Sequence, residues 1–587
     1  MKLPSLDVLI SQAKETASRF PIAILMSILG SFTLIRIIDF APIDYQGQFL
    51  WNLVMTFSLG LPLFIAFSLI AESTGIEKVK KYLLQLIPIA FLLVYFFTLS
   101  DQMDFYDIGR YILLSIAFHL LVSFAPFIFT KDKSQLDFWN FNQTVFLRFI
   151  LSGLYTFVLY GGLAIALLSF DKLFEMNIDG KRYGQLLFFI VGIFNTWFFC
   201  SGIPKPEDMK SEAFPKGLKI FTQYVLLPII VIYVLILYLY LFKIIFSWNL
   251  PVGWVSYLVI GFSTAGIFSL LLIYPLVKSK EIKWVKIFSR IFFISLIPQI
   301  VLLFLAISVR TTDYGMTERR YYVFVLAFWL SVTTIYYIIT NFKNIKYIPI
   351  SLSIIAVLTS VGPWSAFNMS LNSQISRLEE ILNKNSILVN ERIIPATKDI
   401  QQEEIQDVNS IMSFLLERNK INEIQPWFTE NLDSLEDYKK VTEAVYHNKT
   451  EQIMQMMGLK TDNVNNLIKK RFVSARTTGA SEINVQGFDR FSLFESQKKD
   501  SLSAIKSYYD FENNDIIVYN NTDTIKFPIK YITDSLHSER PPLQSMTMNN
   551  YFKDMHVRII VTGIDFNREE NGIKVTYLRA YILTKKL

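Results

Sequence analysis

The sequence predicts an α-helical polytopic membrane bundle of about 11 transmembrane helices, followed by a smaller α+β domain outside the cytoplasm. Three observations predict this fold class. Of the 587 residues, 52% are hydrophobic and only 18% are charged, whereas soluble chains carry about 25% charged residues. Apolar stretches of roughly 20 residues, long enough to cross a bilayer, recur through the first two thirds of the chain. The last third is more polar and ends in strand-like patterns.

Three regions follow from these patterns. Residues 1–19 form an amphipathic N-terminal segment that we expect to lie along the membrane surface. The alternative is a short polar leader without fixed structure. Residues 20–368 form the multi-span membrane domain, and residues 369–587 form a soluble α+β domain. The expected spans are 20–38, 50–71, 82–99, 111–129, 145–170, 186–200, 218–242, 254–277, 288–309, 321–340 and 347–363.

The positive charge of the loops predicts the orientation. With the N-terminus in the cytoplasm, the cytoplasmic segments carry about twice as many lysines and arginines as the opposite side, as the positive-inside rule requires. An odd number of spans then places the domain at 369–587 on the far side of the membrane, so we predict that it is extracytoplasmic.

Composition excludes several other classes of protein. The single cysteine, Cys200, excludes a disulfide framework and a multi-cysteine zinc site. With only four histidines as well, we expect no metal and no cofactor. The net charge of +7 arises in the hydrophobic region rather than on a basic soluble module, so we expect no nucleic-acid partner.

The last third reads as helices followed by a small antiparallel sheet. Helical patterns lie at 399–419 and 435–457, and strand-like patterns lie at 485–495, 515–529, 557–566 and 572–583. We find no nucleophile elbow, zinc-protease helix or phosphate-binding loop. This domain is therefore interpreted as a binding or docking module, with a protein on the far side of the membrane as its expected partner.

The connection between the ninth and tenth spans, RTTDYGMTERR, concentrates charge at one membrane boundary. Arginine side chains suit phosphate or carboxylate recognition, and the candidate ligands of an anionic group or lipid headgroup are Arg310, Arg319 and Arg320. The expected organisers of that site are Asp313, Tyr314, Gly315 and Glu318. The alternative interpretation is an ion-paired cap that locks the two helices together.

One ionisable residue lies well inside an apolar span. His119, in SIAFHLLVSF, is a candidate proton carrier, because ionisable side chains inside a membrane are costly and need a reason. The alternative is a histidine that is hydrogen-bonded between helices.

Seven segments in a fixed order resemble one known family: RFPIAIL (19–25), FWNFNQTVFLR (138–148), LYGGLAIAL (159–167), LPVGWVSYLVIGFS (250–263), DYGMTERRYYV (313–323), GPWSAFNMSLNSQISRLEEIL (362–382) and INVQGFDRFSLF (483–494). Together they resemble the DUF4153 family, uncharacterised polytopic inner-membrane proteins of bacteria that are common in Bacteroidota. The resemblance spans nearly the whole chain. It implies a bacterial inner membrane, and hence a periplasmic outer domain, but no activity.

Three functions compete at this point. The first is a transporter-like or envelope-assembly protein that handles an anionic or lipid-linked envelope component, with the bilayer and a periplasmic protein as its other partners. The second is a membrane-embedded transferase acting on a lipid-linked substrate. It requires Asp104 or Asp107 to converge around a cavity with the arginines of the charged connection, Arg310, Arg319 and Arg320. The third is a sensor or scaffold whose outer domain binds while the spans only anchor it.

Overall fold

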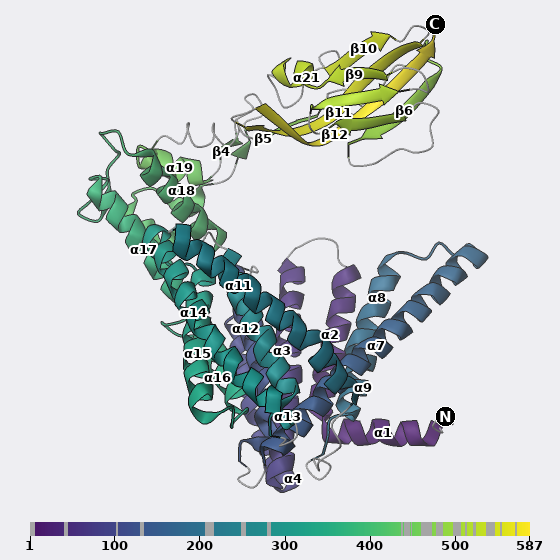
Figure 1. Cartoon of the computed structure of the whole chain (residues 1–587), viewed down its shortest axis with the longest axis vertical. Coiled ribbons are helices and arrows are strands. Elements are labelled where there is room, and N and C mark those ends of the chain that lie inside the picture. Colours follow the sequence, from purple (N-terminus) through teal and green to yellow (C-terminus); the bar gives the residue numbers. More distant parts are fainter. Residues whose placement is uncertain are drawn as a thin grey trace. The chain divides into compact units, whose positions relative to one another are not determined.

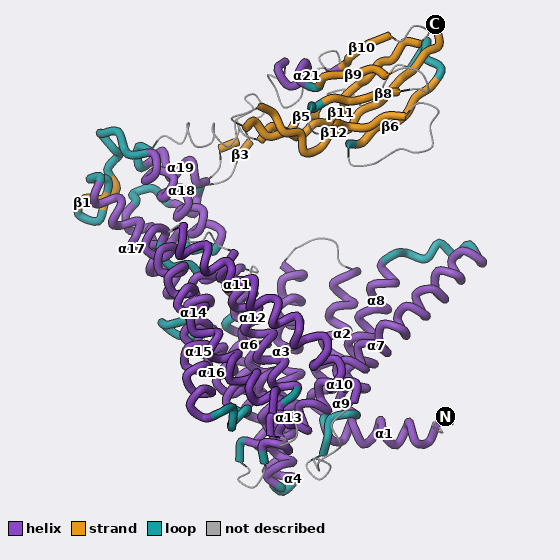
Figure 2. The backbone as a smooth tube through the Cα atoms, viewed as in Figure 1, coloured by secondary structure: helices purple, strands orange, loops and turns teal. Residues whose placement is uncertain are grey.

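The computed structural model describes residues 6–39, 45–100, 104–129, 134–205, 216–247, 254–278, 283–435, 438–439, 446–447, 449–459, 472–476, 485–496, 506–510, 513–519, 524–535, 546–551, 555–569 and 572–587. The chain groups into two compact units. A helical unit contains Met1–Arg392 and Ser410–Ser434, and a strand-rich unit contains Ile393–Asn409 and Leu435–Leu587. Figures 1 and 2 show the helices of the first unit and the strands of the second.

The N-terminal segment is a helix, α1 (Leu6–Arg19), which runs across the end of α2 (Pro21–Asp39) (Figure 1). Pro21 stands at the first position of α2, where its missing N–H costs no helical hydrogen bond and its ring separates the two helices. The Trp197 indole N–H donates to the Ala13 carbonyl, so α1 is held against α9 (Thr196–Ser201). That α1 lies on a membrane surface stays a prediction.

Nine helices of the described chain are long and apolar enough to cross a membrane. Besides α2, four of them are single helices: α3 (Tyr45–Thr74), α7 (Gln135–Phe174), α14 (Lys283–Tyr314) and α15 (Glu318–Thr340). The other four are made of consecutive elements: α4 (Lys78–Leu84) with α5 (Leu86–Phe97); α6 (Phe105–Phe124) with η1 (Ala125–Phe127); α8 (Lys181–Phe189) with η2 (Ile190–Asn195) and α9; and α10 (Lys216–Phe221) with η3 (Thr222–Leu226) and α11 (Leu227–Ser247). Two shorter apolar helices are α12 (Trp254–Leu272), which α13 (Tyr274–Lys278) continues, and α16 (Tyr347–Ser360). A helix therefore occupies each of the eleven predicted spans, and nine of these helices have the full length for a crossing.

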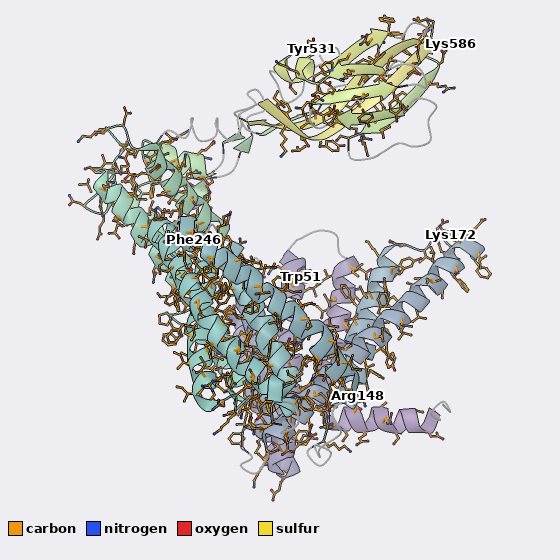
Figure 3. All side chains as sticks on the ribbon, viewed as in Figure 1. Trp51, Arg148, Lys172, Phe246, Tyr531 and Lys586 are labelled. Carbon is orange, nitrogen blue, oxygen red and sulfur yellow. The ribbon has the colours of Figure 1, made fainter. Side chains whose placement is uncertain are left out.

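The helices pack around a core to which α3 and α14 contribute buried residues. Leu59 and Leu69 of α3 and Leu296 and Leu303 of α14 are buried almost completely. Apolar residues also cover the outside of the unit: Phe246 at the end of α11 is 86% exposed, and Figure 3 shows its position. A soluble protein rarely leaves so many large apolar side chains exposed, whereas a bilayer solvates them.

The chain after the last span folds back onto the helical unit. Ser365 caps α17 (Ala366–Lys384) by accepting a hydrogen bond from the Asn368 N–H, and α17 packs against α15 and α16. Further elements are β1 (Leu388–Val389), β2 (Arg392–Ile393), α18 (Gln402–Glu417), η4 (Ile421–Trp427) and η5 (Leu432–Ser434).

The described part of the strand-rich unit contains two larger antiparallel sheets and one short pair of strands, described below. One has the order β10-β11-β12-β6, with β5 paired to β11, and the other has the order β7-β8-β9. The strands are β5 (Phe472–Arg476), β6 (Arg490–Glu495), β7 (Lys506–Asp510), β8 (Asp515–Tyr519), β9 (Thr524–Pro528), β10 (Thr547–Tyr551), β11 (Met555–Glu569) and β12 (Gly572–Lys586). Val557 and Ile559 of β11 and Val518 of β8 meet in a common apolar core. Each of the four predicted strand patterns contains a strand, which confirms the predicted sheet.

One predicted helix is wrong in its first part. Within 435–457, the described residues Tyr438–Lys439 (β3) and Tyr446–His447 (β4) pair as two short antiparallel strands, and the helix α19 begins only at Lys449 and ends at Met456. Tyrosine favours strands, and pairing with a neighbouring segment overrides a weak helical pattern. One more short helix, α21 (Lys530–Ser535), follows β9.

Candidate functional site

The charged connection between α14 and α15 forms a tight turn. Gly315 has a positive φ of 68°, a conformation that glycine adopts without strain. The Arg320 guanidinium donates to the carbonyls of Tyr314 and Gly315, the first at 3.0 Å. These carbonyls end a helix and need donors, so Arg320 caps α14. Thr317 stands at the N-cap position of α15, but its side chain makes no capping hydrogen bond.

The same turn is held by α17. The Gln374 amide donates to the carbonyls of Tyr314 and Met316, at 3.1 and 3.0 Å, and the Met316 N–H donates to the Ser373 hydroxyl at 2.9 Å. Arg319, Asp313 and Tyr314 are exposed, and Arg310 is half-buried. The structure therefore gives this connection the contacts of a locked helix cap, and the predicted arginine ligands do not line the cavity described below.

Glu318 is the member of the connection that faces inward. It is only 2% exposed, and its two oxygens accept from Nε and a terminal nitrogen of Arg418 at 2.7 and 3.0 Å. Arg418, which follows α18 and belongs to the helical unit, also lies 3.7 Å from the Phe414 ring centre. A two-pronged pair of this kind fixes both side chains, since each charge needs the other when buried.

A second buried pair lies at the start of α6. Asp107 is fully buried and Arg110 is 7% exposed. Asp107 accepts from the Ser100 N–H at 3.0 Å and from Arg110 at 3.2 Å, and Arg110 donates also to the Thr98 carbonyl at 3.0 Å. The Nε–H of Arg110 is buried and has no hydrogen-bond partner among the described residues. Such an orphaned donor on a buried cation is unusual and calls for an acceptor.

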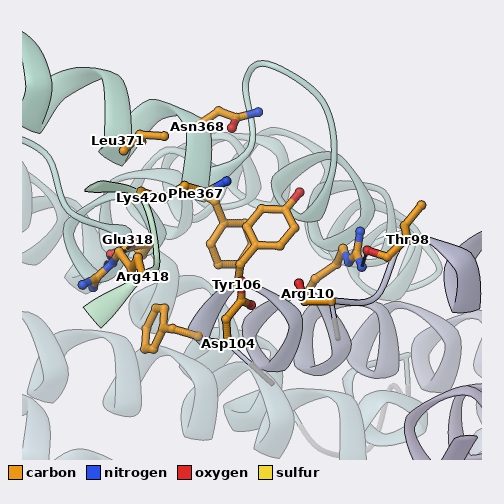
Figure 4. Close-up of a pocket in the computed structure, with 12 residues that line it drawn as sticks. Thr98, Asp104, Tyr106, Arg110, Glu318, Phe367, Asn368, Leu371, Arg418 and Lys420 are labelled. Atoms are coloured by element: carbon orange, nitrogen blue, oxygen red, sulfur yellow. Dashed lines mark hydrogen bonds and ion pairs between the residues drawn. The ribbon is translucent and has the colours of Figure 1, made fainter. Parts of the chain in front are cut away.

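The two pairs border one cavity of about 350 Å³, which we call the polar cavity. Its lining residues are Thr98, Ser100, Asp104, Phe105, Tyr106, Arg110, Glu318, Phe367, Asn368, Leu371, Arg418 and Lys420. Figure 4 shows the rings of Tyr106 and Phe367 between the Arg110 side and the Arg418–Glu318 side. The volume is in the range of ligand pockets, which hold roughly 300–1,000 Å³.

Phe367 is fixed by a close approach of two helices. A Cβ atom added at Gly109 would stand 2.7 Å from the Phe367 ring, so only glycine leaves room there. The ring also meets Tyr106 edge to face, with centroids 4.6 Å apart. The beginning of α17 is thereby seated on α6, and this contact forms one wall of the cavity.

Asp104 begins α6 and supplies a carboxylate to the cavity. Its side chain caps the helix by accepting from the Asp107 N–H at 2.8 Å. Burial raises the pKa of the Asp104 carboxyl above its usual value; the charge of Asp107 adds to this, and Lys420 opposes it. The cavity thus combines three cations with two carboxylates, and burial raises the pKa of one of these, Asp104.

His119 lies in a different cavity. Its Nδ1 is 2.7 Å from the Ser115 carbonyl one turn earlier, so Nδ1 carries the proton in this bond, because a carbonyl only accepts. His119 lines a space of about 430 Å³ whose other polar lining residues are Asn142, Ser152, Asn195 and Thr196. It is 14 residues beyond Phe105, or about 21 Å along α6. Neither this space nor the polar cavity joins His119 to the predicted arginines.

The sequence reasoning missed Arg110, Arg418 and Lys420. One local signal existed: Asp107 and Arg110 stand three residues apart at the start of an apolar span, the spacing of an ion pair on one helix face. Arg418 carried no such signal, since its partner Glu318 is 100 residues away in the chain.

A helical bundle with a polar cavity at the ends of apolar helices defines the protein as a multi-pass membrane protein. A family described as "Domain of unknown function (DUF4153)" matches residues 23–389, more than half of the chain. The chain therefore belongs to the DUF4153 family, as its motifs predicted. The segment INVQGFDRFSLF, at 483–494, lies outside the matched residues.

A curated relative extends the comparison without naming an activity. The chain is 26% identical over 239 residues to the uncharacterized protein PM1469 of Pasteurella multocida (strain Pm70). The matched region covers 40% of this chain and 40% of that protein. No solved structure matches the chain.

Proposed function

We propose that this protein is a transporter-like or envelope-assembly protein of the bacterial inner membrane, and that it binds an anionic or lipid-linked envelope component in the polar cavity. The observation that carries the proposal is the Arg110 side chain. It is more than nine-tenths buried, it lines the cavity, and its Nε–H has no partner among the described residues. The Nε atom itself is enclosed by the protein, so an anion in the cavity would meet the guanidinium at its terminal nitrogens.

The chemistry of the lining favours an anion with further polar groups. Arg418 is engaged by Glu318 and by the Phe414 carbonyl, so it contributes charge more than free donors. Arg110 and Lys420 supply donors, and Asp104 supplies an acceptor for a hydroxyl or amine. Phosphate groups are bound by this combination of guanidinium and ammonium donors.

The orientation belongs to the proposal as well. The loop charges favour a cytoplasmic N-terminus, and an odd number of crossings then puts the strand-rich unit in the periplasm. A periplasm-dependent alkaline phosphatase fused after Leu587 should be active. Activity only of a cytoplasm-dependent reporter at that position would reverse the orientation and place the polar cavity on the cytoplasmic side.

The binding test uses the full chain purified in detergent. Native mass spectrometry should detect a co-purifying anionic lipid or lipid-linked component. In the double variant Asp107→Asn/Arg110→Gln, both charges of the buried pair disappear together, so no uncompensated charge remains to unfold the protein. We expect bound component to fall at least tenfold in this variant. Arg319→Gln is the matched control, because Arg319 is exposed and does not line the cavity. Equal amounts of bound component in both variants would refute the proposed binding site.

A membrane-embedded transferase is the second candidate, and one observation favours it. Asp104, a carboxyl whose pKa is raised by burial, faces the same cavity as Arg110 and Arg418. A carboxylate with a raised pKa suits general base catalysis near neutral pH. The variant Asp104→Asn keeps a good helix cap. If the protein is a transferase, this variant should retain the bound component and lose the modified lipid that wild-type protein forms in vesicles of inner-membrane lipid extract. Formation of that product by the variant would exclude Asp104 as the base.

A sensor or scaffold remains the third candidate, with the strand-rich unit as the part that binds a periplasmic protein. Residues 1–434 expressed alone in cells distinguish it. Retention of the bound component by this fragment would assign binding to the helical unit.

A further inference from the structure

An apolar groove of about 440 Å³ lies between α6, α15 and α16. It is lined by Phe105, Ile108, Gly109, Ile112, Leu113, Ile116, Leu120, Tyr322, Val325, Leu326, Leu352, Ile355, Ala356 and Thr359. Ile112 and Ile116 are about half exposed, so the groove is open along its side. A hydrocarbon chain could therefore enter it laterally from the bilayer.

The groove and the polar cavity adjoin at Phe105, which lines both spaces. The Phe105 ring also lies 4.7 Å from the guanidinium carbon of Arg418, which lines the polar cavity. A charged pocket that adjoins an apolar groove is the arrangement that a lipid needs for its headgroup and its chain.

The groove is long compared with one leaflet. From Phe105 to Leu120, α6 advances 15 residues, or about 22 Å, whereas half of the hydrocarbon core is about 15 Å. At its far end Leu120 also lines a second apolar cavity of about 270 Å³, between α6, α7, α12 and α16. The apolar path along α6 thus continues beyond the depth of one leaflet.

The lining allows a chain and excludes a headgroup. Among the described residues that line the groove, only Tyr322 and Thr359 have side chains with polar atoms, and the Thr359 hydroxyl already donates to the Ile355 carbonyl. A phosphate moved into this part would lose its hydration without gaining donors. Lipid tails are as apolar as the groove, so a chain gains affinity there through close packing, and the groove selects chain length and shape.

We propose that the ligand is a polyisoprenyl phosphate: a lipid whose phosphate lies in the polar cavity and whose single chain, longer than one leaflet, follows the groove past Ile116. The inference rests on the proposed function, because it requires the polar cavity to hold the headgroup. It adds the class of lipid, which the polar cavity alone does not define.

The test compares three phosphate lipids on the purified full chain: a polyprenyl monophosphate of about eleven isoprene units, farnesyl monophosphate, and dioleoyl phosphatidic acid. Ile116→Trp places a bulky ring in the groove about 17 Å beyond Phe105, deeper than one leaflet. Ile291→Trp is the matched control, because Ile291 is a 58% exposed isoleucine on α14, away from the groove. Binding is measured by native mass spectrometry and by thermal stabilisation.

The expected result depends on chain length. Wild-type protein should bind the polyprenyl phosphate at least tenfold more tightly than the farnesyl phosphate. Ile116→Trp should lower the affinity for the polyprenyl phosphate at least fivefold. The affinity for farnesyl phosphate, whose chain ends before position 116, should be unchanged. Unchanged farnesyl binding also shows that the variant is folded.

Two other results would overturn the inference and remain distinguishable. If phosphatidic acid binds as tightly as the polyprenyl phosphate and Ile116→Trp has no effect on either, the chain inference fails while the headgroup site stands. If none of the three lipids binds, or if all bind equally to Asp107→Asn/Arg110→Gln and wild type, the proposed headgroup site fails together with it.

Discussion

Two buried arginines, Arg19 and Arg110, lie toward opposite ends of α3 and differ in how their donors are used. Arg19 donates to both oxygens of Glu72, at 2.8 Å each, and to the carbonyls of Ile203 and Pro204. It joins the end of α1 to the end of α3 and to the chain after α9. Arg110 has only two acceptors, Asp107 and the Thr98 carbonyl, and its Nε–H has none among the described residues.

The difference separates a structural clamp from a candidate binding group. Each nitrogen of the Arg19 guanidinium has an oxygen partner, so adding a ligand would break a bond that already exists. Arg110 is more deeply buried and yet has spare donor capacity beside a cavity. A buried cation with incomplete hydrogen bonding is the better candidate for function, because folding alone gives no reason to leave it so.

The largest expected effect comes from breaking the clamp. Arg19→Gln leaves the largely buried Glu72 carboxylate without its cation, and we expect a loss of about 3 kcal/mol in stability. Thermal unfolding in detergent measures it. Lipid occupancy below the unfolding transition should stay at the wild-type level. A loss under about 1 kcal/mol would mean that the clamp is worth no more than a surface ion pair.

The next prediction separates the two roles of Arg110. Arg110→Gln alone strands the buried Asp107 charge, so it should lower both stability, by about 3 kcal/mol, and headgroup binding. Adding Asp107→Asn should restore most of the stability and none of the binding. Unfolding and binding measured on the same three proteins check this. If the double variant recovered headgroup binding, Arg110 would have a structural role only, like that of Arg19.

A smaller effect is expected from pH. Because the pKa of Asp104 is raised, its carboxyl takes up a proton at higher pH than an ordinary aspartate as the solution is acidified. Protonation removes a negative charge beside the ligand, so phosphate binding should tighten as pH falls through that pKa. The affinity ratio of Asp104→Asn to wild type, measured at each pH to cancel titration of the phosphate, should be largest at high pH and approach one at low pH. A ratio that is constant with pH would show that Asp104 does not face the ligand.

The smallest effect is expected at the predicted site residue Arg319. Its side chain is exposed, so Arg319→Gln should change stability by less than about 0.5 kcal/mol. Lipid occupancy should also be unchanged. A tenfold loss of occupancy would return the site to the α14–α15 connection, as the sequence first suggested.

Hydropathy and residue patterns predict the spanning helices and most strands but miss the pair β3–β4, and the reason is physical. Each spanning helix is defined by its own apolar residues, so a local pattern such as that of α14 is sufficient to find it. The strands β8 and β11 are likewise visible from alternation and β-branched residues. The paired strands β3 and β4 depend on a neighbouring segment, and the local helical pattern gave the wrong element there.

The polar cavity could be predicted only in part. Glu318 was expected to organise a site and does line the cavity, and Asp104 was expected beside arginines. The arginines that line the cavity are Arg110 and Arg418, whereas charge density along the chain pointed to Arg319. Arg110 and Arg418 come to one cavity because α17 and the segment after it pack back against the helices. Proximity of that kind has no signature in a single sequence.

The polar cavity also constrains how the chain is threaded through the bilayer. The end of α5 and the beginnings of α6, α15 and α17 all reach it. Between Asp104 and Glu318 the polypeptide must therefore cross an even number of times, and between Glu318 and Phe367 an even number again. If a single helix inserted in the wrong direction, the helix ends that line the cavity would lie on opposite sides of the membrane. The cavity therefore forms only when the helices have inserted with these ends on the same side of the membrane.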